Sequence, residues 1–343
     1  MAKPILVLKF GSATLTKSNG ELDQLIMVEI ARQVSYLYTN YYIVIVSSGA
    51  VAAGKQYIKN YKRELAQRKA AAAVGNLLLL NKYAQFFDPY NIPIAQSLCE
   101  RRHFANRDAF LQIKETFYEL WSNGIIPIVN ENDVVSSREL KFSDNDELAT
   151  LIAVGFGADT LLLCTSVGGL LDYEGNIIRQ IEHIKEVFKY VRNDTSSVGL
   201  GGMTSKLTFA KLATRMGIRT VIFGMSVADG ILKAVEGKNG TLFPAQQTSL
   251  SARNRWLGSG SLVAGKLAID KGAAQALQKR KSLLAVGVQN VQGDFEAGEV
   301  VEIIDSEGHI IAVAKAKETS AVIVKNLRTQ NFEVANANDI VLL

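Results

Sequence analysis

The chain has 343 residues, of which 48% are hydrophobic and 21% are charged, and its formal net charge is +5. This apolar fraction is sufficient for a buried core, which excludes a wholly disordered chain. The modest charge excludes a protein built only to coat nucleic acid. At about 150 residues per domain, the length predicts two or three domains.

The cysteines and the apolar runs bear on the location of the protein. Cys99 and Cys164 are too few for a disulfide framework, and we expect both to be reduced core residues. The first apolar run, 5–8, is too short for a signal peptide. The most apolar stretch, 148–171, is broken by a charge and several glycines, and it predicts a helix and then a buried strand. We therefore expect a cytoplasmic protein without a membrane partner.

Up to about residue 245, short apolar runs alternate with longer amphipathic segments. Continuous apolar runs are typical of strands buried on both faces of a parallel sheet. Strands are predicted over 5–8, 43–46, 92–95, 125–129, 160–164 and 220–223. Helical periodicity is found over 22–37, 105–121 and 203–216. The alternation predicts an α/β/α sandwich with a mainly parallel sheet.

Within the first amphipathic segment, one stripe of apolar residues is expected to face the core. Its members are Leu22, Leu25, Ile26, Ile30, Val34 and Leu37. They recur at the spacing of one helix face, so the segment is predicted to pack on the sheet.

The pattern changes at a polar segment, 244–251, which resembles a linker. Beyond it we expect one short helix over 273–281. Strands are predicted over 283–288, 299–304, 310–314, 321–324 and 340–343. This region is predicted to form a small, mainly-β barrel or sandwich. The predicted domains are residues 1–245 and 256–343.

Ligands of open α/β sheets bind at the carboxyl ends of the strands, so the residues that follow each predicted strand are candidate binding residues. The first strand ends at Lys9, between two apolar residues, which is equally compatible with a surface lysine and a functional one. The second ends before Ser48 and Gly49, where a helix N-terminus would suit a carboxylate. Residues 49–55 match the G-x-x-x-x-G-K spacing, but Gln56 lacks the hydroxyl that magnesium needs, so a P-loop is rejected.

Two polar clusters follow the fourth strand, at 130–133 and 141–146. The second could simply cap a helix. Two such clusters at one sheet edge exceed what capping requires. From the residue types, they could hold an ammonium group, position lysines or bind Mg²⁺ through water.

The fifth strand ends at Thr165 and Ser166, and a glycine-rich segment, 199–202, leads to Lys206 at the start of a helix. Glycines before a helix N-terminus, with a lysine in its first turns, predict a phosphate site. The alternative is a flexible loop with a solvated lysine. A Rossmann dinucleotide site is not predicted, because no G-x-G-x-x-G follows the first strand.

Taken in order, these motifs resemble those of the glutamate 5-kinases, within the amino acid kinase family. The matching segments are 9–12, 46–54, 128–133, 144–146 and 201–206, and residues 253–256 match the stretch that precedes a C-terminal PUA domain in that family. The resemblance covers essentially the whole chain. It implies phosphoryl transfer from ATP to the γ-carboxylate of L-glutamate, which gives L-glutamyl 5-phosphate in the first step of proline biosynthesis.

The resemblance also implies roles for individual residues. Those implied in catalysis are Lys9, Lys206 and Asp146. Those implied in glutamate binding are Ser48, Gly49, Asn130, Asp133 and Asn145. Those implied in ATP binding are Lys9, Thr165, Ser166, Gly201, Gly202, Met203 and Lys206. No protein ligand is assigned to Mg²⁺, which the ATP phosphates would hold. The family further implies feedback inhibition by proline and a homo-oligomer.

Two alternatives come from different classes of function. One is another amino acid kinase, acting on acetylglutamate, aspartate, carbamate or UMP. The other is an RNA-binding protein that acts through the PUA-like domain. From Ala252 onward the chain has 11 basic and 10 acidic residues, so the net charge of this domain does not support RNA binding.

Overall fold

The computed structural model describes residues 3–17, 19–100, 103–104, 107–135, 145–182, 202–247, 263–295 and 297–342. The chain divides into two compact units. One contains residues 1–101 and 111–248, and the other contains residues 102–110 and 249–343. No helix in the described parts of the chain is long and apolar enough to cross a membrane.

The first unit is built around a seven-stranded sheet with the order β3-β4-β2-β1-β5-β6-β7. Its strands are β1 (Ile5–Phe10), β2 (Tyr42–Ser47), β3 (Ile94–Cys99), β4 (Ile126–Glu131), β5 (Thr160–Cys164), β6 (Arg219–Phe223) and β7 (Thr241–Phe243). Neighbouring strands are parallel except that β7 runs antiparallel to β6. The chain goes from β1 to one side of the sheet and later to the other. The carboxyl ends beside β1 therefore form a topological switch point, where ligands of such sheets bind.

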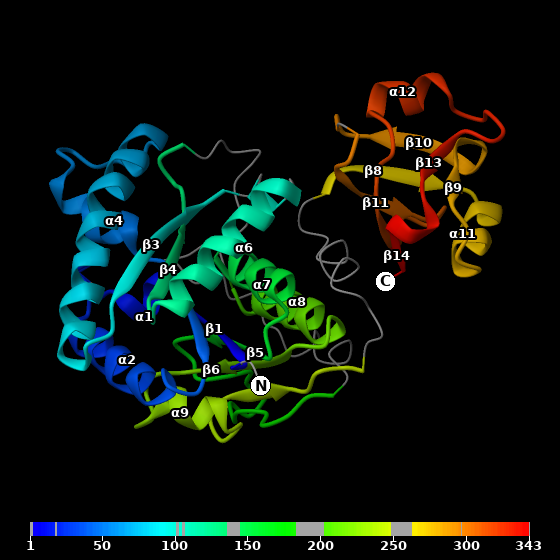
Figure 1. Ribbon diagram of the computed structural model, residues 1–343. Helices are drawn as coiled ribbons and strands as arrows, with labels where there is room; N and C mark the ends of the chain where they lie inside the picture. Colours follow the sequence, from blue (N-terminus) through cyan, green and yellow to red (C-terminus); the bar gives the residue numbers. More distant parts are fainter. Residues whose placement is uncertain are drawn as a thin grey trace. The chain divides into compact units, whose positions relative to one another are not determined.

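Helices cover both faces of this sheet (Figure 1). They are α1 (Ser12–Leu15), α2 (Gln24–Leu37), α3 (Ala50–Gly54), α4 (Leu65–Phe87), α6 (Arg107–Ser122, from residue 111 onward in this unit), α7 (Asn145–Phe156), α8 (Met203–Arg215) and α9 (Gly230–Val235). Helices α2, α4 and α9 pack on one face, where they share a buried apolar cluster with the strands. Helices α7 and α8 pack against each other on the opposite face, over β1 and β6. This arrangement is the α/β/α sandwich predicted from the sequence.

The two faces of β1 explain the position of its lysine. Leu6, Leu8 and Phe10 point into the cluster shared with α2 and α4. Side chains alternate along a strand, so Val7 and Lys9 point to the other face, where α7 lies over β1. All six residues of β1 are buried. Lys9 is therefore a buried lysine, and its charge requires a partner within the protein.

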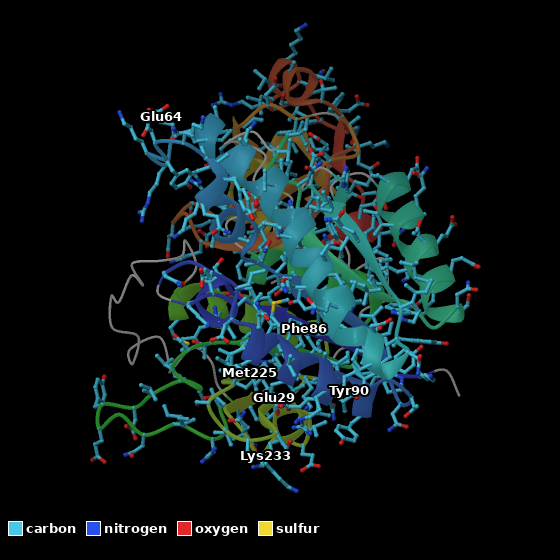
Figure 2. All side chains as sticks on the ribbon, turned by 90° about the vertical axis from the view of Figure 1, so that its left-hand side faces the viewer. Glu29, Glu64, Phe86, Tyr90, Met225 and Lys233 are labelled. Atoms are coloured by element: carbon cyan, nitrogen blue, oxygen red, sulfur yellow. The ribbon has the colours of Figure 1, made fainter. Side chains whose placement is uncertain are left out.

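Helix α4 packs closely against the short helix α3. A Cβ on Gly75 would collide with the carbonyl oxygen of Ala50, and a Cβ on Gly54 would collide with that of Ala71. Only glycine permits this approach of the two backbones. Figure 2 looks onto this layer, with Glu64 just before α4 and Phe86 near its end. The contact fixes α4 against the segment that follows β2.

The second unit is mainly β structure around its own core. Its strands are β8 (Val263–Ile269), β9 (Leu283–Leu284), β10 (Val288–Gln292), β11 (Val300–Ile304), β12 (Ile310–Lys315), β13 (Glu333–Ala335) and β14 (Ile340–Leu342). Five form a sheet with the order β10-β8-β11-β12-β14, and β13 pairs with β9. The helices are α11 (Lys271–Gln278) and α12 (Ser320–Lys325). The small mainly-β domain predicted from the sequence is confirmed.

Three local predictions were wrong. Residues 321–324 form part of helix α12 and not a strand, because the Thr319 side chain caps the helix by accepting from the backbone N–H of Val322. The strand predicted over 283–288 is broken by a 3₁₀ turn at 285–287. Leu25 lies in the first turn of α2 and is 80% exposed, while Met27 and Ala31 join the buried face in its place.

Candidate active site

The site is organised by the first turn of α7, which begins at Asn145 and Asp146. Its N-terminus lies by the carboxyl ends of β1, β2 and β4, because the side chains of these two residues contact groups from all three strands. The side chains of two consecutive residues leave a helix in different directions. One turn of helix therefore serves two groups of residues, which we call the lysine cluster and the amide cluster.

The lysine cluster consists of Lys9, Asp146 and Lys206. Lys9 Nζ lies 2.6 Å from Asp146 Oδ1, and Lys206 Nζ lies 2.8 Å from Asp146 Oδ2. Asp146 has no exposed surface, and both lysines are buried. Lys206 comes from the first turn of α8, which packs on α7. One carboxylate thus holds two ammonium groups side by side, with one positive charge in excess within the cluster.

The pKa of Asp146 reflects these partners. Burial by itself raises the pKa of this carboxyl, but the charges and hydrogen bonds of Lys9 and Lys206 outweigh it and hold the pKa below its ordinary value. Asp146 is therefore ionised at neutral pH. Both of its oxygens contact ammonium groups, so in this structure Asp146 holds the two lysines together.

The amide cluster consists of Asn145, Asn130 and Ser48. Asn145 Nδ2 donates to Ser48 Oγ at 2.8 Å and to Asn130 Oδ1 at 2.9 Å. It also lies 3.3 Å from the backbone oxygen of Ser47. These residues come from the ends of β2 and β4 and from the start of α7. They form an uncharged polar surface beside the charged cluster.

The end of β5 contributes a neutral thiol next to the lysine cluster. Cys164 is buried, and its Sγ lies 3.5 Å from Thr14 Oγ1. Burial raises the pKa of this thiol to about 11, although the nearby charges of Lys206 and Lys9 act in the opposite direction. Cys99 is likewise free and buried. The prediction that both cysteines are reduced core residues is confirmed.

The other predicted site residues lie around the same edge where the structure describes them. Gly49 precedes α3 with a φ of 104°, a conformation that favours glycine. Asp133 lies half-buried in the turn after β4, and Thr165 and Ser166 directly follow β5. Gly202 caps α8, and Met203 is its first residue. Gly201 and Asp144 lie outside the described residues.

The described residues also bear on how a metal ion could be held. Among those residues, no group of three or more His, Cys, Asp or Glu side chains is arranged to hold a metal ion. Asp146, the carboxylate of the lysine cluster, is paired with two lysines.

Sequence reasoning missed two buried polar residues on α4. Asn76 Oδ1 accepts a hydrogen bond from Asn130 Nδ2 at 2.9 Å. The hydroxyl of Tyr83 lies 3.0 Å from Ser47 Oγ. Burial raises the pKa of Tyr83, which therefore stays protonated. The two residues are seven positions apart, hence two turns along one face of α4. The sequence signal that could have found them is their position, since both are polar residues on the core-facing side of a helix rich in alanine and leucine.

Comparison with known proteins agrees with this architecture. The model of the amino acid kinase family matches residues 4–224, and the model of the PUA domain matches residues 265–331. Carbamate kinase from Giardia lamblia shares the fold, with a TM-score of 0.52 and 17% identity over 71% of this chain and 99% of its own. The chain therefore belongs to the amino acid kinase family and carries a PUA domain at its C-terminal end.

Its curated relatives are more specific. The glutamate 5-kinase of Kosmotoga olearia is 38% identical over 90% of this chain and 86% of its own length. The glutamate 5-kinase of Dehalococcoides mccartyi is 36% identical over 98% of both chains. The resemblance to the glutamate 5-kinases that the sequence motifs indicated is confirmed by these relatives.

Proposed function

We propose that this protein transfers the γ-phosphoryl group of ATP to the γ-carboxylate of L-glutamate and so forms L-glutamyl 5-phosphate. The curated relatives that it matches along most of its length are glutamate 5-kinases. The observation that carries the proposal is the pair Asn145 and Asp146. These consecutive residues hold an uncharged amide cluster and a pair of buried lysines next to each other. The reaction needs a site for a polar amino acid beside a site for phosphate.

We assign glutamate to the amide cluster together with Gly49 and Asp133. Asn145, Asn130 and Ser48 offer carboxamide and hydroxyl groups, which hydrogen-bond a carboxylate or an ammonium without adding charge. Asp133, in the turn after β4, would pair with the ammonium group of the amino acid. The segment at Ser48 and Gly49 leads into α3, where backbone N–H groups suit a carboxylate.

We assign the phosphates of ATP to Lys9, Lys206 and the start of α8. The N-terminus of α8 begins at Gly202 and Met203, and helix N-termini favour anions. The proposed ATP site also includes Thr165 and Ser166, which follow strand β5, and Gly201. Magnesium would be bound mainly by the phosphates of ATP and would neutralise part of their charge.

The residues then act by position and charge. A glutamate carboxylate has an ordinary pKa of about 4.3, so it is ionised at neutral pH and needs no general base. Its oxygen attacks the γ-phosphorus, the bond to the β-bridging oxygen breaks, and ADP leaves. The barrier arises from bringing two anions together, and two ammonium groups held by Asp146 lower it. The amide cluster keeps the attacking carboxylate in line.

The test is the release of ADP from Mg-ATP with and without L-glutamate. Acetylglutamate, aspartate, carbamate and UMP are supplied in parallel, and hydroxylamine is added to trap an acyl phosphate as a hydroxamate. We expect ADP release and hydroxamate formation with L-glutamate far above the levels with the other acceptors. Equal stimulation by another acceptor, or none by glutamate, would overturn the proposal.

Several finer assignments remain predictions. We propose residues 1–245 as the kinase domain and 256–343 as the PUA domain, and the two family matches fall within these limits. Proline biosynthesis as the pathway, feedback inhibition by proline, a homo-oligomer and a cytoplasmic location follow from the resemblance to the glutamate 5-kinases. Size-exclusion chromatography and the effect of proline on ADP release would test two of them.

A further inference from the structure

Helix α4 supplies a buried amide that contacts the amide cluster. Asn76 is 6% exposed, and its Oδ1 accepts a hydrogen bond from Asn130 Nδ2 at 2.9 Å. It lies 54 positions before its partner in the sequence and belongs to none of the motifs that identified the site. Its hydrogen-bond partner, Asn130, is one of the proposed glutamate-binding residues.

The orientation of Asn130 is set by the main chain. The backbone N–H of Glu131 donates to Asn130 Oδ1 at 2.9 Å. Because a backbone N–H can only donate, this oxygen cannot exchange places with the amide nitrogen. Asn130 Nδ2 must therefore point the other way, towards α4, where it needs an acceptor. Asn76 Oδ1 is that acceptor.

The state of the other end of Asn76 supports this role. Among the residues that the structure describes, Asn76 Nδ2 is buried and has no hydrogen-bond partner. An unpaired buried donor is unfavourable and uncommon in folded proteins. Asparagine at this position is thus explained by its oxygen, which serves Asn130, and not by any bond of its own nitrogen.

The orientation is passed on to Asn145. Asn130 Oδ1 accepts from Asn145 Nδ2 as well as from Glu131, and Asn145 in turn donates to Ser48. A continuous line of hydrogen bonds thus runs from α4 through β4 and α7 to the end of β2. If Asn130 rotated to find another acceptor, Asn145 would lose the oxygen that orients it.

The backbone of α4 is held in a fixed position where Asn76 contacts Asn130. Gly75, the residue before Asn76, lies against the backbone of α3, where any side chain would collide with the carbonyl oxygen of Ala50. The distance of α4 from the strand ends is therefore fixed at the position of Asn76. Two turns further along, Tyr83 makes the corresponding contact to Ser47 at the end of β2.

We propose that Asn76 is a positioning residue for the amino acid substrate. It acts through Asn130 to hold Asn145 in the orientation that binds the substrate, and it does not touch ATP or the lysine cluster. This inference rests on the proposed function for the identity of the substrate. It predicts that the loss of Asn76 impairs glutamate binding selectively.

The experiment compares Asn76→Leu, which removes the acceptor, with Asn76→Gln, which keeps a carboxamide oxygen. We expect Asn76→Leu to raise the glutamate KM about tenfold, the effect of one buried hydrogen bond and the group it orients, with the ATP KM within about twofold of the wild type. Asn76→Gln should return the glutamate KM to within about threefold of the wild type. Asn76→Ala is measured alongside, so that a folding defect of the leucine variant does not decide the outcome.

The matched control is Asn81→Leu, the same substitution at an exposed position of α4. It should leave both KM values unchanged. Two results would overturn the inference. One is a rise of the glutamate KM and the ATP KM by the same factor in both Asn76→Leu and Asn76→Ala. The other is an unchanged glutamate KM in both variants. Wild-type protein without glutamate-dependent ADP release would instead overturn the proposed function, so the two failures are distinguishable.

A double-mutant cycle separates action through Asn130 from an independent effect. Asn130→Ala should raise the glutamate KM by itself, and adding Asn76→Leu should raise it little further, because the contact is already lost. Fully additive effects on the glutamate KM would show that Asn76 does not act through Asn130.

Discussion

The two clusters at the start of α7 differ in how they use the same turn of helix. The lysine cluster places three charged side chains in contact and in near-complete burial. The amide cluster uses only carboxamide and hydroxyl groups. A buried charge is costly without its partner, whereas a buried amide loses one hydrogen bond when its neighbour is removed.

This difference separates the work of the site. Positive charge has its largest effect where negative charge accumulates, which in phosphoryl transfer is the transition state. The amide cluster would contact glutamate before as well as during the transfer, and an interaction made equally in both states lowers KM without raising kcat. The lysine cluster should therefore determine kcat, and the amide cluster should determine the glutamate KM.

The largest effect should come from Lys206→Ala. Removing this ammonium leaves Lys9 paired with Asp146 and takes one positive charge from the phosphoryl group. By analogy with other cationic groups in phosphoryl transfer, glutamate-dependent kcat should fall about 10³- to 10⁵-fold, while the chain stays folded. ADP release and thermal unfolding measure the two properties.

The control for this variant is Lys238→Ala, which removes an exposed lysine paired only with Glu236 among the described contacts. It should keep the activity of the wild type. Near-normal turnover in Lys206→Ala would remove this lysine from the reaction and would break the distinction between the clusters.

Asp146→Asn should show that the lysine cluster also carries stability. The substitution leaves two buried ammonium groups beside a neutral amide, and the loss of one partner from a buried ion pair costs about 3–5 kcal/mol. We expect the free energy of unfolding in urea to fall by an amount of that order, and kcat to fall with it. An unfolding free energy equal to that of the wild type would show that the cluster is hydrated in solution.

The sequence motifs named every member of both clusters but did not reveal Asn76, the neighbour of the amide cluster on α4. Lys9 stood out because it interrupts an apolar strand, and Asp146 and Lys206 stood out beside strand ends and glycines. Asn76 did not stand out from its neighbours in the sequence, because a single asparagine in a helix can be exposed or buried. Its role depends on the close approach at Gly75, which is a tertiary contact.

The same reasoning explains the errors in the fold. The alternation of apolar strands and amphipathic helices was sufficient to predict the sandwich, since both periods are local. The apolar run 321–324 is too short for its periodicity to distinguish a strand from a helix. The cap at Thr319 stabilises the helical conformation. Leu25 has the correct helical spacing but lies in the first turn of α2, where its side chain is exposed.

A smaller effect is expected for Asn145→Ala. The variant loses the hydrogen bonds to Ser48 and Asn130 but no charge. The glutamate KM should rise about tenfold, and the ATP KM should change less than threefold. Initial rates measured over a matrix of both substrate concentrations separate the two constants. A larger change in the ATP KM would place Asn145 on the nucleotide side of the site.

The smallest effect concerns acid stability. The pKa of Asp146 is lowered in the folded protein, so its pairing stabilises the fold above its ordinary pKa of about 3.8, and this contribution is lost as the pH falls through the lower, native pKa. The difference in unfolding free energy between the wild type and Asp146→Asn should be constant near neutral pH and shrink in acid. A difference that grew as the pH fell would contradict the lowered pKa.

The central claim is that the ionised γ-carboxylate of glutamate attacks the phosphorus directly. It is tested most directly with glutamate whose γ-carboxylate is labelled with ¹⁸O. Hydroxylamine attacks the acyl carbon of the product, and the phosphate that leaves keeps the bridging oxygen. The account predicts a single ¹⁸O atom in each phosphate released with the hydroxamate, measured by mass spectrometry. Phosphate without the label would show that another oxygen accepts the phosphoryl group and would contradict the account.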